Sequence, residues 1–166
     1  MPLARLVNVD FIWVHGASTV LEATLAHTMN SHGVPTLVAE MGVGMRVTRA
    51  YGDQLTDGIF HLMAHLGIWS GPVAPSREPV ISRRPDDVAF LNAPVSGIFL
   101  KETEHGAHLR QGEIIGRIVN PLTGEVLETV CAPCDGWLFT VREYPVVGQG
   151  SLMARILREG GGSHAV

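Results

Sequence analysis

The sequence predicts an α/β segment followed by an all-β domain. Residues 5–69 alternate strand-like and helix-like apolar patterns, whereas residues 70–87 hold four prolines and no regular period. Beyond them, short apolar runs are separated by glycine, proline and aspartate turns. We therefore expect four parts, namely an α/β part at 1–69, a proline-rich linker at 70–87, a β domain at 88–158 and a disordered tail at 159–166.

Two buried strands are expected in the α/β part. Residues 9–14 (VDFIWV) and residues 36–41 (TLVAEM) are short apolar runs bounded by polar or glycine-containing segments. Helical patterns follow each of them, and the order strand, helix, strand, helix favours parallel strands.

The helix boundaries are marked by capping residues. Ser18 is the expected N-cap of the first helix, Gly33 is the expected residue just after its end, and Pro35 prevents its continuation. The second helix is expected over about 53–66, with Gly67 at its end.

The β half contains an internal repeat. The stretch APVSGIFL, which begins at Ala93, returns as APCDGWLF at Ala132, and RQGEIIGRIV returns as GQGSLMARIL at an offset of 38 residues. Two such units packed about a pseudo-twofold axis form a small barrel or sandwich. This pattern resembles the biotinyl/lipoyl-like domain, which implies a barrel-sandwich hybrid over about residues 88–157.

That resemblance also implies where a carrier lysine would lie. Biotinyl and lipoyl carriers hold their prosthetic group on the hairpin between the two copies of the repeat. Here that hairpin is residues 120–128, and it contains no lysine. The single lysine of the chain, Lys101, lies in the first copy of the repeat. We therefore do not expect a biotin or lipoyl carrier.

Composition limits the class of protein. The chain has 166 residues, 17% of them charged, and a formal net charge of -4, so neither nucleic acid nor a membrane surface is an expected partner. No apolar run approaches the roughly 20 residues that span a bilayer. Two cysteines make no disulfide framework, and we expect a cytoplasmic protein.

Cys131 and Cys134 form a Cys-x-x-Cys pair. A redox pair needs a helix N-terminus to lower the thiol pKa, but a turn and a strand-like run follow here. A zinc site would need two more ligands, for which His105 and His108 are conceivable. The favoured interpretation is structural, with a metal site as the alternative.

Three histidines are further candidates. His61 and His65 are four residues apart on the second predicted helix, a spacing that places both imidazoles on one face and can chelate zinc. The metalloprotease version of this motif has glutamate after the first histidine, where this chain has Leu62. His15 follows the first strand and is a minor candidate.

Glu40 is the strongest catalytic candidate. It lies at the end of the predicted strand 36–41, where ligands of open α/β sheets bind. Partial burial there would raise its pKa and suit a general base. The alternative is a carboxylate that caps a loop or pairs with Arg46 or Arg49.

Nearly all of residues 10–157 resemble one family. The stretches GVPTLVAEMGVGMR and LTDGIFHLMAHLGIWSG, followed by the APVSGIF module, are similar to the C-terminal part of succinylglutamate desuccinylase/aspartoacylase proteins. These are zinc-dependent deacylases with a carboxypeptidase-like sheet. The resemblance implies that Glu40 takes a proton from a zinc-bound water and delivers it to the leaving amine. It implies an N-acyl amino acid or a similar small acylated amine as substrate.

The zinc motif of that family is not found in this sequence. No His-x-x-Glu occurs in it, so no metal ligand is assigned. We expect a hydrolase-family chain that is inactive alone and needs either a missing N-terminal half or a second copy. The alternative is a non-catalytic structural or adaptor module, and zinc at His61 and His65 or at Cys131 and Cys134 is a third possibility.

Overall fold

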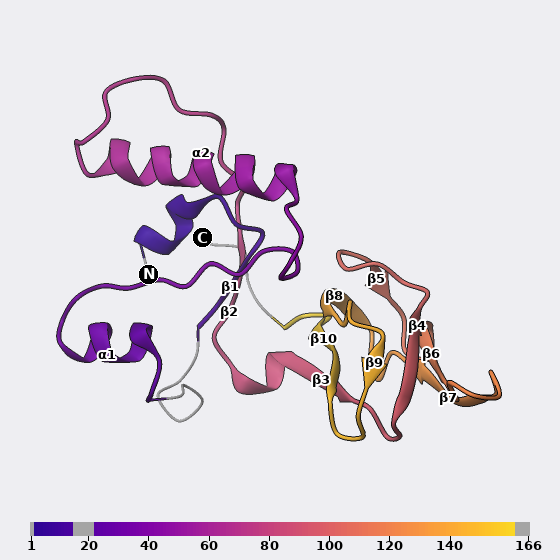
Figure 1. Ribbon diagram of the computed structural model, residues 1–166. Helices are drawn as coiled ribbons and strands as arrows, with labels where there is room; N and C mark the ends of the chain where they lie inside the picture. The colour runs from indigo at the N-terminus through magenta and orange to yellow at the C-terminus, as the bar shows by residue number, and fades with distance from the viewer. Residues whose placement is uncertain (1, 15–21, 162–166) are drawn as a thin grey trace. The chain divides into compact units, whose positions relative to one another are not determined.

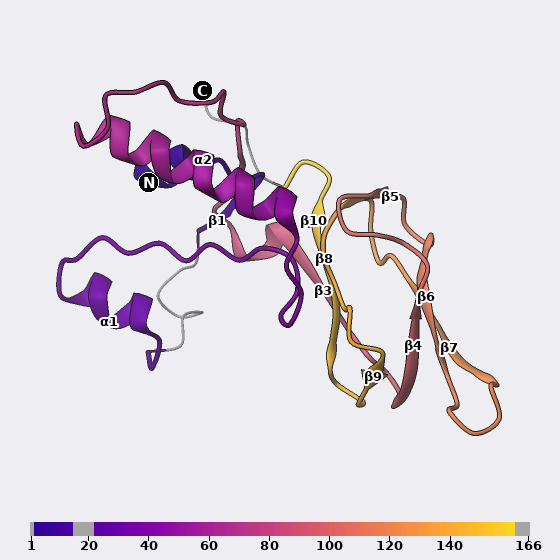
Figure 2. The same ribbon diagram turned by 45° about the horizontal axis from the view of Figure 1, so that its top comes forward.

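The computed structural model describes residues 2–14 and 22–161, and these divide into two compact units (Figures 1 and 2). Unit 1 contains the described residues up to Arg83, and unit 2 contains those from Arg84 onward. No helix in the described ranges is long and apolar enough to cross a membrane.

Unit 1 contains one pair of short parallel strands. β1 (Phe11–Trp13) lies within the predicted strand 9–14, and it pairs with β2 (Val80–Ser82). The sequence predicted no strand in residues 70–87, so β2 is a correction. Three residues are too few to show a period of two, and the strand is defined instead by pairing with a distant segment.

Both predicted helices are present in unit 1, after a short 3₁₀ helix η1 (Leu3–Val7). α1 (Leu25–Ser31) is capped by the Thr24 hydroxyl, while the predicted cap Ser18 lies outside the described residues. α2 (Arg49–His65) begins four residues earlier than predicted.

Both helices end at the predicted glycines. Gly33 has φ +77° and Gly67 has φ +73°, the left-handed conformation that glycine adopts without steric cost. After each glycine, the next amide donates a 2.9 Å hydrogen bond back to the carbonyl of Met29 or Met63. This is the Schellman arrangement, which satisfies carbonyl groups at a helix C-terminus.

The predicted strand at 36–41 is wrong. Residues 37–43 form no backbone hydrogen bond with any other described residue, and Leu37 and Val38 are 50% and 68% exposed. Only Thr36 is held, by two 3.0 Å hydrogen bonds to the Asn30 side chain. A strand exists only where a neighbour pairs with it, and no described strand pairs with this segment.

Unit 1 is held together by buried polar groups more than by an apolar core. Among its described residues, only Ala4 and Ile81 are buried and hydrophobic. Asn8 Nδ2 donates to the backbone carbonyl of Gln54 at 3.1 Å, and Gln54 Nε2 donates to the backbone carbonyl of Asn8 at 2.7 Å. The Arg77 amide donates to Asn8 Oδ1 at 2.9 Å, so three distant segments are joined at one point.

Unit 2 begins with a 3₁₀ helix, η3 (Pro85–Asp87), and continues as two antiparallel four-stranded sheets. The first sheet has the order β3 (Val88–Asn92), β10 (Leu152–Arg158), β8 (Gly136–Val141), β5 (His108–Leu109). The second has the order β7 (Val126–Cys131), β6 (Ile114–Val119), β4 (Gly97–Lys101), β9 (Val146–Val147). The prediction of an all-β second half is confirmed.

The internal repeat explains the order of these sheets. Strands β3, β4, β5 and β6 belong to the first copy and correspond to β7, β8, β9 and β10 of the second. Exchanging each strand for its counterpart converts the order β3-β10-β8-β5 into β7-β6-β4-β9. The two copies are therefore related by a pseudo-twofold axis, and each contributes strands to both sheets.

One apolar core joins the two sheets. Ile115 and Ile118 on β6 and Leu138 and Ile156 on β8 and β10 belong to the same buried cluster and are 0% exposed. Burial of each such side chain contributes about 1.5–3 kcal/mol to folding. Neither sheet would cover this face alone, so the two copies of the repeat fold as one body.

Candidate functional site

Glu40 lies in the irregular segment between α1 and α2. Its side chain is exposed, contrary to the expected partial burial. Within the described ranges it forms no hydrogen bond or ion pair. Arg49 is instead 3.8 Å from Asp53, one helical turn further along α2. The loop-capping and ion-pairing interpretations of Glu40 therefore lack support.

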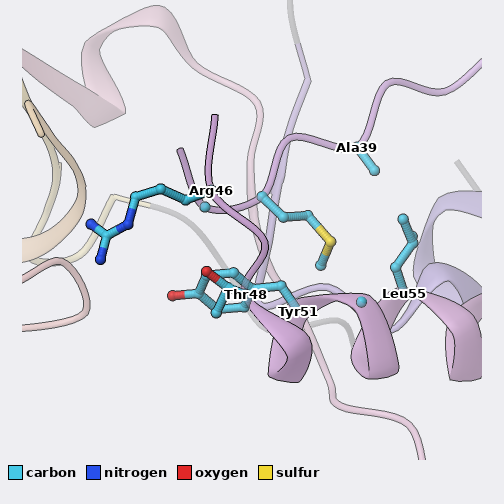
Figure 3. Close-up of a pocket in the computed structure, with 8 residues that line it drawn as sticks. Ala39, Arg46, Thr48, Tyr51 and Leu55 are labelled. Atoms are coloured by element: carbon cyan, nitrogen blue, oxygen red, sulfur yellow. The ribbon is translucent and has the colours of Figure 1, made fainter. Parts of the chain in front are cut away.

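A cavity of about 270 Å³ lies between this segment and the start of α2 (Figure 3). In the close-up, Tyr51 and Leu55 rise from α2, and Ala39 lies across from Leu55 on the irregular segment. The residues that line the cavity are Ala39, Met41, Gly42, Arg46, Thr48, Tyr51, Gly52 and Leu55. Arg46 is the single charged residue among them.

Gly42 shapes the wall of this cavity. It has φ +61°, and a Cβ at this position would lie 3.1 Å from the Tyr51 ring. Glycine therefore serves both the backbone conformation and the close approach of the ring. The glycine-containing segment after residue 41 predicted only the end of a strand, and nothing in the sequence indicates Tyr51 as a neighbour.

Glu40 and the cavity face different sides of the segment. Ala39 and Met41 both line the cavity, while Glu40 between them does not. This matches the alternation of side chains in an extended chain. Glu40 is thus an exposed residue that does not line the cavity.

The two helix histidines belong to no group of three potential metal ligands among the described residues. The His61 ring is hydrogen-bonded to the Ala74 carbonyl and is half-buried, whereas His65 is exposed at the end of α2. His61 therefore ties α2 to the chain that follows it. His15 lies outside the described residues.

The two cysteines flank the turn between β7 and β8. Cys131 is the last residue of β7, and both thiols are free. The strand β8 follows, as the sequence predicted, so the pair does not lie at a helix N-terminus, where redox Cys-x-x-Cys pairs lie. Cys134 packs against the apolar core, as does Val95, its counterpart in the first copy of the repeat. This pairing supports a structural role for Cys134.

Cys134→Val is expected to change the free energy of unfolding by about 1 kcal/mol or less, because the fold already accepts valine at the equivalent position. Urea denaturation of the variant and the parent chain would measure the difference. A loss of several kcal/mol, or zinc bound by the parent chain and lost in the variant, would contradict the structural interpretation.

The described parts of the chain contain no group of three or more His, Cys, Asp or Glu residues placed to hold a metal ion. This applies to His105 and His108 as possible partners of the cysteines, as well as to the helix histidines. The residues that the structure describes therefore do not form a zinc site.

Lys101 lies at the end of β4 and not on the hairpin between the two copies. Its ammonium group donates to Glu104 at 2.6 Å and to Glu143. Burial lowers the pKa of Lys101, but the two carboxylates raise it by more, so the pKa lies above its ordinary value. Lys101 is thus an ion-paired residue of the sheet.

Solved structures share the fold of this chain. The product-bound Ectoine utilization protein EutE from Ruegeria pomeroyi matches 93% of it with a TM-score of 0.79 and 15% identity, over 47% of that protein. A succinylglutamate desuccinylase/aspartoacylase from Rhodobacter sphaeroides matches 94% with a TM-score of 0.74 and 21% identity, over 47% of that protein. The chain has the fold of one part of a succinylglutamate desuccinylase/aspartoacylase protein.

A third structure, a succinylglutamate desuccinylase from Silicibacter sp. TM1040, matches 93% of the chain with a TM-score of 0.78 and 20% identity, again over 47% of its length. The resemblance predicted from the sequence is thus confirmed at the level of the fold. The chain spans about half the length of the solved proteins that it matches. No protein-family model and no curated protein sequence matches it.

Proposed function

We propose that this chain is one part of a deacylase that hydrolyses the amide bond of an N-acyl amino acid or a similar small acylated amine. The fold carries this proposal, because 93% of the chain matches EutE from Ruegeria pomeroyi with a TM-score of 0.79. Two further structures with this fold are named as succinylglutamate desuccinylases or their aspartoacylase relatives. Such an enzyme releases a carboxylic acid and a free amine.

In this reaction Glu40 is the proposed proton-transfer group. Its carboxylate would take a proton from the attacking water and give it to the leaving amine. Two observations support the assignment: the side chain is exposed, and it forms no ion pair with the described residues. Substrate would reach the exposed Glu40 side chain from solvent.

The family resemblance implies a zinc ion, which would activate water and polarise the acyl carbonyl. The described residues do not fit this ion, because no three potential ligands converge. We therefore assign no zinc ligand in this chain. Metal ligands and substrate contacts would come from residues other than those described, so we expect no turnover by the chain alone.

The finer structural assignments are part of the same proposal. The pseudo-twofold pairing of the two copies in unit 2 supports a barrel-sandwich hybrid over residues 88–158. An α/β part at 1–69 joined to it by residues 70–87, a homo-oligomeric state and a cytoplasmic location remain predictions. The alternative is a non-catalytic module, and the activity measurement below would distinguish it from a deacylase.

Glu40→Gln is expected to lower kcat by about 10²–10⁴-fold in the complete protein that carries this chain together with its metal-binding half. Glutamine keeps the size of the side chain but cannot accept the proton. Amine release from N-acyl amino acids would be measured together with bound zinc, which should be unchanged.

Glu78→Gln provides a matched control, because Glu78 is also exposed in unit 1 and the charge change is identical. It should leave kcat within about twofold of the parent. Full turnover by the Glu40→Gln variant would remove Glu40 from the mechanism. Absence of any hydrolysis by the complete protein would favour the non-catalytic module.

A further inference from the structure

The second sheet of unit 2 carries a row of four apolar side chains. Val146 on β9 lies opposite Ile98 on β4, and Ile98 lies opposite Val119 on β6. Val119 in turn lies opposite Val126 on β7. Side chains that lie opposite each other on neighbouring strands are close enough to interact, so the row is continuous across all four strands. We refer to these four residues as the apolar row.

The apolar row lies on the outer face of this sheet. The residues that follow or precede it on β9, β4 and β6 are Val147, Phe99 and Ile118, and all three belong to the buried core cluster. Because side chains alternate between the two faces of a sheet, the row faces away from the core. Val146 is 67% exposed and Val126 is 49% exposed. The unpacked face of an antiparallel sheet is usually polar, so this row indicates a surface that another molecule covers.

Two leucines enlarge the apolar surface around the row. Leu100 is two residues from Ile98 along β4, on the same face, and is 50% exposed. Leu122 is at the tip of the hairpin between β6 and β7 and is 93% exposed. The Asn120 side chain orders this tip, because its Oδ1 accepts hydrogen bonds from the amides of Leu122 at 2.9 Å and Thr123 at 3.3 Å. The turn thus holds Leu122 in an exposed position.

The pseudo-twofold axis provides an internal comparison for the apolar row. Its counterparts in the first sheet, 38 or 39 residues away and paired in the same order, are Val88, Leu157, Trp137 and His108. Val88 is the counterpart of Val126 and is the same type of residue, yet it is 5% exposed. Leu157, the counterpart of Val119, is also 5% exposed, and neither belongs to the core cluster. This position of the repeat is therefore buried in the first sheet and open in the second.

The charged residues of the two central strands are neutralised within the chain. Lys101 on β4 pairs with Glu104 and Glu143, and Arg117 on β6 pairs with Glu102. These strands contain no other charged residue. A partner that recognises this sheet by opposite charge would find no unpaired cation on β4 or β6. The row therefore suits an uncharged apolar surface, and a second copy of this chain presents one.

We propose that the apolar row is the interface of a symmetric dimer of this chain, in which the second sheets of two copies pack face to face. In a twofold dimer both copies use the same surface, so the apolar row of one copy meets the apolar row of the other. Face-to-face packing of antiparallel sheets is the arrangement of β-sandwiches. The inference concerns assembly and does not depend on the proposed deacylase activity.

The size of this face fits a weak dimer. Four strands about 4.8 Å apart and up to six residues long give a face of roughly 400 Å² in projection. A standard interface buries about 800 Å² of accessible surface on each partner. Interfaces of standard size have dissociation constants from micromolar to picomolar, so we expect about 1–100 µM for this smaller one.

Sedimentation velocity of the full chain between about 1 µM and 1 mM would test the dimer. We expect a reversible change from monomer to dimer with rising concentration. Because the contact is apolar, its dissociation constant should change by no more than about threefold between 0.1 and 1 M sodium chloride.

Val126→Lys is expected to raise the dissociation constant at least about 30-fold, because a symmetric dimer would bury the added ammonium group twice. Val146→Lys should act in the same direction from another strand. Val73→Lys is the matched control, since Val73 is a 40% exposed valine of unit 1 and gains the same charge. Circular dichroism of the three variants should match the parent, which separates lost association from lost folding.

Four results would overturn the proposal. They are a monomer at every concentration, a dimer that persists unchanged in Val126→Lys and Val146→Lys, equal weakening by Val73→Lys, and dissociation by salt. Equal weakening would show that the contact is nonspecific, and dissociation by salt would show that it is ionic. A dimer that depends on the apolar row, in a complete protein that does not hydrolyse N-acyl amino acids, would contradict the proposed function and leave this inference intact.

Discussion

Ile118→Ala is expected to lower the free energy of unfolding of unit 2 by about 2–5 kcal/mol. Ile118 is 0% exposed and belongs to the cluster that joins the two sheets. Its truncation removes three carbon atoms from a packed core and leaves a cavity that the surrounding strands fill only in part. Hydrogen exchange of the β6, β8 and β10 amides would measure the loss within unit 2.

Ile114→Ala is the matched control on the same strand. Ile114 is 38% exposed, so the same truncation should cost about 1 kcal/mol or less. Equal losses at Ile114 and Ile118 would show that the core does not lie between the two sheets.

The pseudo-twofold axis extends this prediction to Ile156. It follows Ile118 by 38 residues, is also 0% exposed and belongs to the same cluster. Ile156→Ala should therefore cost about as much as Ile118→Ala, to within about 1.5 kcal/mol. A larger difference would mean that one copy of the repeat forms the stable core and that the other is attached to it.

The architecture of unit 2 was predictable because its signals are local and occur twice. The turn motif, the apolar runs and the glycines recur at a nearly constant offset, so each copy supports the interpretation of the other. The ends of α1 and α2 were predictable for a similar reason, since Gly33 and Gly67 satisfy carbonyl groups of their own helices.

Unit 1 was predicted less well because its strands depend on distant partners. β2 is three residues long and is defined by pairing with β1, 69 positions earlier in the chain. The segment 36–41 has a strand-like sequence, but no described strand pairs with it. Its apolar pattern is typical of a buried strand, but the described residues do not bury it or pair with it.

In the candidate site, too, the features with a local sequence signal were predicted and those that depend on distant residues were not. Glu40 was predicted as a catalytic residue because it follows an apolar run that looks like a strand. In the structure it has no hydrogen-bond or ion-pair partner among the described residues. Its expected burial depended on the sheet around it and was wrong. The cavity behind it depends on the approach of Tyr51 to Gly42, nine residues apart, and neither residue type indicates such a contact.

Gly136→Ala is expected to lower the free energy of unfolding of unit 2 by about 2 kcal/mol or more. A Cβ at this position would lie 2.2 Å from the carbonyl oxygen of Leu157 and 2.8 Å from the Ile156 side chain. The carbonyl belongs to the neighbouring strand β10, so the backbone of β8 or β10 would have to shift to admit the methyl group. Hydrogen exchange across β8 and β10 would report the loss.

Gly148→Ala is the control for a glycine-to-alanine change without a close strand contact. A Cβ at Gly148 would have its nearest neighbour, the Ser151 hydroxyl, at 3.6 Å, which is an ordinary contact. We expect a change within about 0.5 kcal/mol. A similar loss at Gly148 and Gly136 would show that the cost does not come from strand contact.

The same contact occurs in the first copy of the repeat. A Cβ at Gly97 would lie 2.6 Å from the Val119 carbonyl oxygen and 2.7 Å from the Ile118 side chain, and these residues precede Leu157 and Ile156 by 38 positions. The glycine of Ala-Pro-x-x-Gly thus lets a strand begin directly against its neighbour.

Gly97→Ala should therefore destabilise unit 2 as Gly136→Ala does, with losses first detected in β4 and β6. If Gly97→Ala were tolerated while Gly136→Ala was not, glycine would be needed for close strand contact in the second copy only. Close contact would then not explain why the glycine occurs in both copies. If both were tolerated, the strands would approach less closely than the structure shows. Comparable losses at both glycines would tie the sequence repeat directly to the pairing of strands.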